Sequence, residues 1–125
     1  MLRVFRDYRL CPCKLALILA TTFGLSALYA QQADFETTFR KGTEALRSGH
    51  LDEAAGSFLL CTKLDPSFAA SYLNLGLTRF QQQKYEMAVA ELKRSIALKP
   101  DIRGANIFIG IADYRMNRYA GAARA

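Results

Sequence analysis

This chain has few of the residues that most often carry catalysis or bind metals. Its only histidine is His50, and its three cysteines are Cys11, Cys13 and Cys61. A single histidine excludes a His-rich zinc site and the HExxH motif. The GxSxG, GxxxxGK[ST] and CxxC motifs are also missing from the sequence. We therefore expect no catalytic residues, no metal site and no cofactor, and a protein that is not an enzyme.

The positive charge of the chain is concentrated near its N-terminus. The whole sequence has a formal net charge of +6. Residues 1–30 hold four basic residues and one acidic residue, which leaves a net charge of +3 for residues 31–125. A nucleic-acid-binding domain is recognised by basic residues clustered on one face. Because much of the basicity belongs to the N-terminal segment, we expect no nucleic-acid partner.

Residues 1–30 are arranged like a secretory signal peptide. The basic residues Arg3, Arg6, Arg9 and Lys14 precede an apolar segment, 15–30, that ends in Leu-Tyr-Ala. Basic, apolar and small-residue regions in this order are typical of an exported protein. We therefore expect residues 1–30 to be a signal peptide and the protein to be periplasmic, envelope-associated or secreted. The alternative is an uncleaved membrane anchor formed by residues 15–30, although a spanning helix needs about 20 residues.

Cleavage at this point would leave one thiol in the mature chain. Cys11 and Cys13 would leave with the signal, so that Cys61 alone remains and no internal disulfide can form. Cys61 stands one period before Ser95, at a small packing position of a helix. We therefore expect Cys61 to be a buried, unreactive thiol.

A fixed spacing of small and large residues recurs along the rest of the chain. Within residues 69–102 it comprises Tyr72, Leu75, Gly76, Ala88, Leu92 and Pro100. One period before Gly76, Ala88, Leu92 and Pro100 stand Gly42, Ala54, Phe58 and Pro66. One period after Gly76, Tyr85 and Ala88 stand Gly110, Tyr119 and Ala122. This spacing resembles the tetratricopeptide repeat, whose helix–turn–helix unit has about 34 residues.

The resemblance implies an all-α fold, an α-solenoid of antiparallel helix pairs. It would comprise about two and a half units, at residues 35–68, 69–102 and 103–125, in a domain that spans residues 31–125. A glycine and an alanine in each unit would let its two helices approach closely. The three expected pairs are Gly42 with Ala54, Gly76 with Ala88, and Gly110 with Ala122.

Helix signals give approximate boundaries for these pairs. We expect helices at residues 33–47, from 51 onward, at 67–82, 85–98 and 102–116, and a short last helix at 119–125. Gly49 is suited to a left-handed C-terminal cap. Repeat arrays usually finish with a polar capping element. None is evident here, so we expect an uncapped C-terminal end, through which the chain could self-associate.

The resemblance also places a concave groove on the first helix of each unit. Nine groove residues follow from the repeat: Phe39, Thr43 and Leu46; Leu73, Leu77 and Phe80; and Ile107, Ile111 and Tyr114. Eight of the nine are apolar or aromatic, which is more than a solvated face needs. Such a groove accepts a partner helix or an extended apolar segment, although further repeats, a second copy or the N-terminal segment would also cover it.

The groove does not match the subtype of this family that holds acidic chaperone tails. That subtype uses five polar or basic groove residues, and only Asn74 matches, because Phe39, Thr43, Gly104 and Phe108 occupy the other places. We therefore predict a non-catalytic scaffold of an exported bacterial tetratricopeptide protein, with other proteins as its partners. Membrane contact would occur only through an uncleaved N-terminal segment. The alternative is an accessory front end, or a truncated copy, of a larger exported enzyme.

Overall fold

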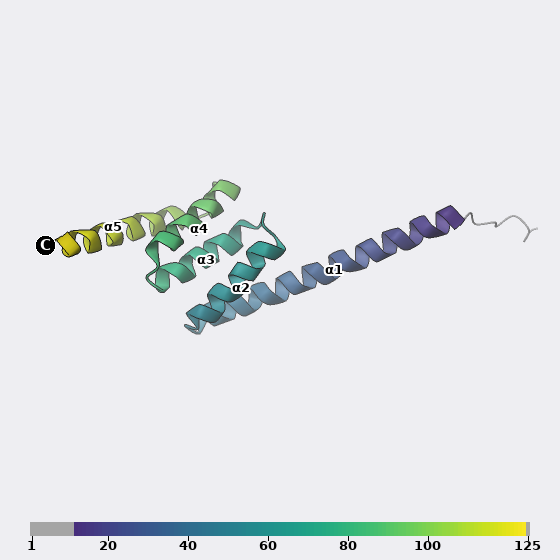
Figure 1. The fold of residues 1–125 in the computed structure, drawn as a ribbon, viewed down its shortest axis with the longest axis horizontal. Helices are drawn as coiled ribbons and strands as arrows, with labels where there is room; N and C mark the ends of the chain where they lie inside the picture. Colours follow the sequence, from purple (N-terminus) through teal and green to yellow (C-terminus); the bar gives the residue numbers. More distant parts are fainter. Residues whose placement is uncertain (1–11, 125) are drawn as a thin grey trace, which may run out of the picture. The chain divides into compact units, whose positions relative to one another are not determined.

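The computed structural model describes residues 12–124, all of whose regular structure is helical (Figure 1). The five helices are α1 (Pro12–Arg47), α2 (Leu51–Leu64), α3 (Ala69–Gln81), α4 (Tyr85–Leu98) and α5 (Ala105–Arg124). The basic start of the expected signal segment, residues 1–11, lies outside the described part. No helix among residues 12–124 has an apolar stretch long enough to cross a membrane.

The chain divides into two compact units, Met1–Ala33 and Asp34–Ala125. The described part of the first unit is helical, and its side chains Leu25, Leu28 and Tyr29 are exposed. We expected a helix to begin near Ala33, but α1 begins at Pro12. No glycine or proline interrupts residues 25–41, and a helix that has already formed gains one hydrogen bond for each residue it adds.

The second unit contains the predicted antiparallel helix pairs. Contacts join α2 with α3, α3 with both α4 and α5, and α4 with α5. Helix α4 has the predicted bounds, and α1 ends and α2 begins at the predicted residues. Helix α3 is slightly shorter than predicted, because Asp65 caps the preceding turn through hydrogen bonds from the Ser67 backbone N–H and hydroxyl, at 3.0 Å and 2.6 Å.

The α1–α2 and α3–α4 turns end the preceding helix in the same way. The Gly49 N–H donates to the Leu46 carbonyl and the His50 N–H to the Ala45 carbonyl, at 3.2 Å and 2.9 Å. This is a Schellman motif with a left-handed residue, and Gly49 has φ +79°, as predicted. One period later Gln83 takes the same conformation, with φ +63°.

Glycine allows close helix contact in the first two units. A Cβ atom on Gly76 would lie 2.8 Å from Leu92 Cγ and 3.2 Å from the Ala88 carbonyl oxygen, so the predicted pair with Ala88 is confirmed. The nearest atoms to a Cβ on Gly42 belong to the Phe58 ring, at 3.0 Å. In each unit the bulky residue four places after the alanine, Leu92 or Phe58, therefore fills the space beside the glycine.

The third unit differs from the prediction. Helix α5 runs without a break from Ala105 to Arg124, so the separate last helix expected at residues 119–125 was wrong. A Cβ on Gly110 would meet no atom within 4 Å, and Ala122 is exposed, so this pair does not form. Tyr119 instead stacks on Tyr85 of α4, with ring centroids 6.3 Å apart.

Helix α5 packs one face on α4 and has a separate polar face. It covers α4 with the buried residues Ala105 and Ala112 and turns another face to solvent. That face carries Asn106, Asp113 and Asn117, which are all exposed. The same helix also exposes the apolar residues Ile107, Ile111, Tyr114 and Tyr119, so the uncapped C-terminal end stays a prediction.

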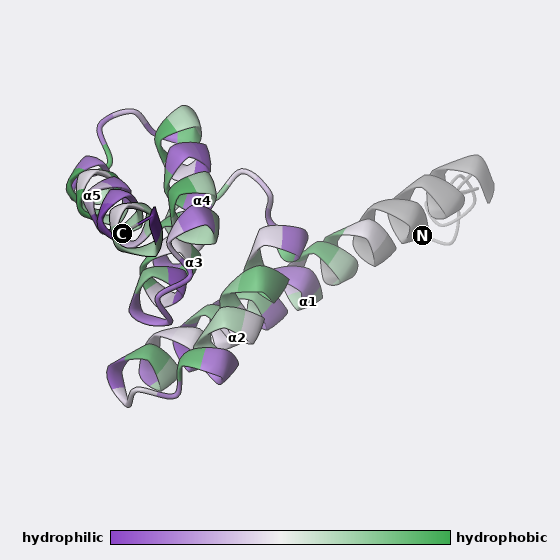
Figure 2. Cartoon of the chain, turned by 60° about the vertical axis from the view of Figure 1, so that its left-hand side comes forward, coloured by the Kyte–Doolittle hydropathy of each residue, from purple (hydrophilic) through white to green (hydrophobic). Residues whose placement is uncertain are grey.

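Two apolar clusters hold the second unit together. The first consists of Ala45, Ala54, Ala55, Phe58 and Leu75, and the second of Tyr85, Val89 and Ala112. Figure 2 shows apolar and polar residues alternating around the helices of this unit, as expected for helices that are covered on one side. Both clusters lie between successive helices, so each helix depends on its neighbour.

Candidate functional site

The repeat places an apolar stripe on each of two neighbouring helices, α3 and α5. Leu73 and Leu77 lie one turn apart on α3 and are half-buried. One period later, Ile107 and Ile111 lie one turn apart on α5, with exposed fractions of 67% and 39%, and Tyr114 follows with 61%. Helices α3 and α5 are in contact. We call these five residues the apolar surface.

The three groove residues predicted on α1 contribute mainly to the core. Phe39 and Leu46 pack against the first cluster, and the Phe39 ring lies 5.6 Å from the rings of both Phe58 and Phe68. The Thr43 hydroxyl donates to the Phe39 carbonyl at 2.9 Å, within its own helix. These side chains are half-buried, so they offer a partner less area than the α5 stripe does.

Phe80 also lies between helices. Its ring meets Tyr85 of α4 edge-on at 5.4 Å and Phe108 of α5 at 5.3 Å. It packs against the second cluster together with Ile109 and Met116. Phe80, although it belongs to the predicted groove, therefore contributes to the contact between helices. A charge at residue 80 would disturb the contact of three helices.

Sequence reasoning missed a basic pocket beside the apolar surface. A hollow of about 290 Å³ is lined by Arg115, Arg118, Tyr119 and Ala122 of α5. The sequence spacing indicated part of this pocket, because Arg118 follows Tyr114 by one helical turn and so continues the same stripe. The break expected between residues 116 and 119 separated Arg115 from Tyr119 and Ala122, so the sequence did not predict that they line one pocket.

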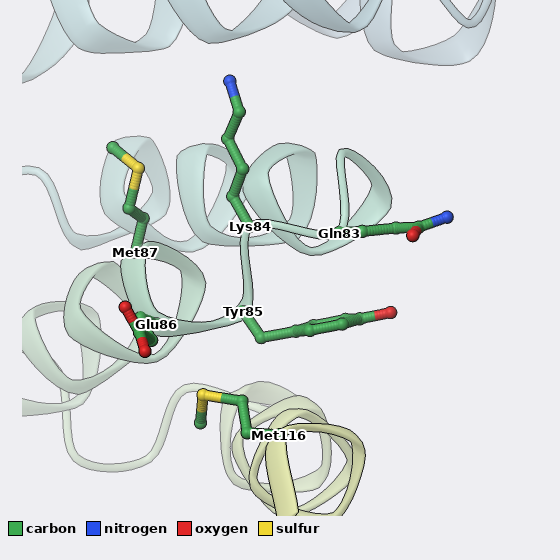
Figure 3. A pocket seen from close by; sticks show the side chains of 6 residues that line it. All are labelled: Gln83, Lys84, Tyr85, Glu86, Met87 and Met116. Carbon is green, nitrogen blue, oxygen red and sulfur yellow. The ribbon is translucent and has the colours of Figure 1, made fainter. Parts of the chain in front are cut away.

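Two further hollows lie at the inter-helix turns. One, of about 310 Å³, is lined by Gln83, Lys84, Tyr85, Glu86, Met87 and Met116, and Figure 3 shows Lys84 extending away from Tyr85 and Met116. The other, of about 600 Å³, lies between the α1–α2 and α3–α4 turns and includes His50 and Lys84. The amide nitrogen Nε2 of Gln82 donates to Asp52 Oδ1 at 2.6 Å and joins these two turns.

Among residues 12–124, no group of three His, Cys, Asp or Glu side chains could hold a metal ion. Cys61 is buried, as predicted, and this burial raises the pKa of its thiol. A thiol held protonated is a poor nucleophile. His50 is exposed in a turn.

Antiparallel helix pairs stacked by a repeated glycine contact define a helical-repeat protein. Residues 69–102 match the family model of the tetratricopeptide repeat. The Arabidopsis OM64 TPR domain is similar in fold, with a TM-score of 0.67 and 19% identity, over 75% of this chain and 78% of that chain. The TPR2B domain of yeast Sti1, solved as a complex with pHsp70, has a TM-score of 0.66 and 21% identity, over 72% of each chain. Residues 69–102 are therefore similar to a tetratricopeptide repeat, and the chain is similar in its all-α fold to these two domains.

Proposed function

We propose that this chain is a non-catalytic protein-interaction module that binds a helix or an extended segment of another protein on the apolar surface. The observation that carries the proposal is the α5 stripe, where Ile107, Ile111 and Tyr114 are exposed side by side. An exposed apolar stripe that continues from one repeat to the next is typical of a binding surface. The Sti1 domain of the same fold is described as a complex with pHsp70, which supports a protein as the partner.

The binding test compares the apolar surface with a matched exposed position. Peptides selected from a displayed library against the full chain are measured by isothermal titration calorimetry. We expect Leu77→Glu and Ile111→Glu to weaken binding strongly, because a carboxylate would have to be desolvated under the peptide. Met87→Glu, at an exposed residue of α4, is the control. Circular dichroism verifies that each variant is folded.

The result that would contradict this function is equally specific. Selected peptides that bind Leu77→Glu and Ile111→Glu as tightly as the unchanged chain must bind elsewhere. Phe80 is not suitable for the test, because its contacts with Tyr85 and Phe108 hold three helices together.

We also propose that the module acts outside the cytoplasm, as a scaffold or assembly factor of an exported protein. The support is the order of basic, apolar and small-residue regions in residues 1–30. Mass spectrometry of the protein from its native host should find a mature N-terminus at Gln31. An intact Met1 on membrane-bound protein would instead favour the anchor formed by residues 15–30.

A further inference from the structure

Two arginines extend the apolar stripe of α5 toward its C-terminal end. Ile107, Ile111, Tyr114 and Arg118 follow one another at intervals of three or four residues, which places them on one side of the helix. The guanidinium carbon Cζ of Arg118 lies 5.9 Å from the centroid of the Tyr114 ring. Arg115 stands one turn after Ile111 and lines the same pocket as Arg118.

These guanidinium groups have no acidic partner of their own. The one salt bridge found among residues 12–124 joins Lys41 and Glu53, at 3.3 Å. The single acidic residue of α5, Asp113, precedes Tyr114, and neighbouring residues on a helix point about 100° apart. Asp113 shares its face with Asn106 and Asn117, at helical intervals. The charge that borders the apolar stripe is therefore positive.

The charge also decides between the occupants that could cover this surface. Helix α5 has three arginines and one aspartate, a net charge of +2. A second copy that paired its α5 with this one would bring two positive helices together, which is unfavourable. A segment with apolar side chains at one end and carboxylates at the other would match both halves of the surface.

We propose that the apolar surface, in the binding role set out above, takes a partner segment whose apolar residues are followed by aspartates or glutamates. The apolar residues lie on Ile107, Ile111 and Tyr114. The side-chain carboxylates reach Arg115 and Arg118, whose planar guanidinium groups can each donate two hydrogen bonds to a carboxylate. The charge thus fixes the direction in which the segment lies along α5.

The test uses two fluorescent peptides that differ only in charge. Both have the same leucine stripe, and one carries three glutamates at one end where the other carries three lysines. Both are acetylated and amidated, so that only side-chain carboxylates are available. Binding to the full chain is followed by fluorescence anisotropy at low and high salt. We expect the glutamate peptide to bind at least about tenfold more tightly, and salt to reduce this difference.

Two variants assign the preference to the pocket. The double variant Arg115→Glu/Arg118→Glu should abolish the preference for the glutamate peptide or reverse it. The control is Lys63→Glu with Lys93→Glu, which changes the net charge equally at exposed residues of α2 and α4, and it should keep the preference. If both peptides bound equally, or if only the control variant lost the preference, the proposal of an acidic partner segment would be overturned.

The outcomes separate this inference from the function on which it rests. If the two peptides bind equally and Ile111→Glu abolishes both interactions, the binding surface stands and its charge selectivity does not. If binding survives Ile111→Glu, the binding surface itself is wrong. Sedimentation velocity should show a monomer, and a dimer lost in Ile111→Glu would assign the surface to a second copy.

Discussion

Substitution of the three repeat glycines by alanine should give three different changes in stability. A methyl group on Gly76 would lie 2.8 Å from Cγ and 2.9 Å from Cδ2 of Leu92, and 3.2 Å from the Ala88 carbonyl oxygen. Leu92 is fully buried, and its Cγ is a branch point close to the main chain. Neither this atom nor a backbone carbonyl can move without shifting α4 relative to α3.

The magnitude follows from two opposing effects. Alanine is favoured over glycine inside a helix by about 1 kcal/mol. An extra methyl group in a well-packed core costs about 1–3 kcal/mol. At Gly76 the clash should exceed the helix gain, and we expect a net destabilisation of roughly 1–2 kcal/mol. For a domain of this size, this lowers Tm by about 4–16 °C.

The other two glycines serve as graded controls. At Gly42 the nearest atoms are those of the Phe58 ring, at 3.0–3.1 Å, so a small ring movement should leave Gly42→Ala within about 1 kcal/mol of the unchanged chain. At Gly110 nothing lies within 4 Å. Gly110→Ala should therefore show only the helix gain, of about 0.5–1 kcal/mol.

The assay is urea unfolding of the full chain, followed by circular dichroism at the helix band. We expect the order of stability Gly110→Ala, unchanged chain, Gly42→Ala, Gly76→Ala, with similar m-values. Leu92→Ala should remove the clash, so that Gly76→Ala costs less in that background. If Gly76→Ala is as stable as Gly110→Ala, the close helix contact proposed for the repeat does not exist.

Three further predictions follow from particular residues. Gln83→Gly should stabilise the chain by about 0.5–1 kcal/mol in urea unfolding, because Gln83 takes the left-handed conformation that Gly49 takes one period earlier; no gain would contradict the Schellman geometry. Ser71→Ala should stabilise or be neutral, since the buried Ser71 hydroxyl has no hydrogen-bond partner and such a group costs about 1–3 kcal/mol. A clear loss of stability would reveal a partner for it. Cys61 should react with a thiol reagent only upon unfolding. Burial raises the pKa of this thiol in the folded state. The stability that the thiol contributes to the folded chain is therefore complete at neutral pH and is lost as alkaline pH approaches the raised pKa. If the stability of Cys61→Ala showed the same dependence on pH as that of the unchanged chain, this expectation would be wrong.

The sequence predicted the repeat where the signals are local. Gly49 carries its own preference for a positive φ, and the apolar period of residues 85–98 specifies helix α4 without reference to other elements. The close approach of α3 and α4 could also be predicted, because glycine recurs beside alanine at the repeat distance. Such features depend on residues within one unit.

The continuation of α5 could not be predicted in this way. Asn117 stands one period after Gln83 and two after Gly49, in the break that we expected between residues 116 and 119. Tyr119 stacks on Tyr85 of α4 when the helix continues. A contact between residues far apart in the sequence thus accompanies the missing turn.

Sequence alone determined which residues share a face of each helix, because that depends only on the helical period. Tertiary structure decided which of those faces stay open. Phe39 and Phe80 stand at the same kind of position as Ile107, yet they pack against Phe58 and Phe108, while Ile107 faces solvent. Exposure depends on the neighbouring helices, whose angles and side chains are not contained in the repeat spacing.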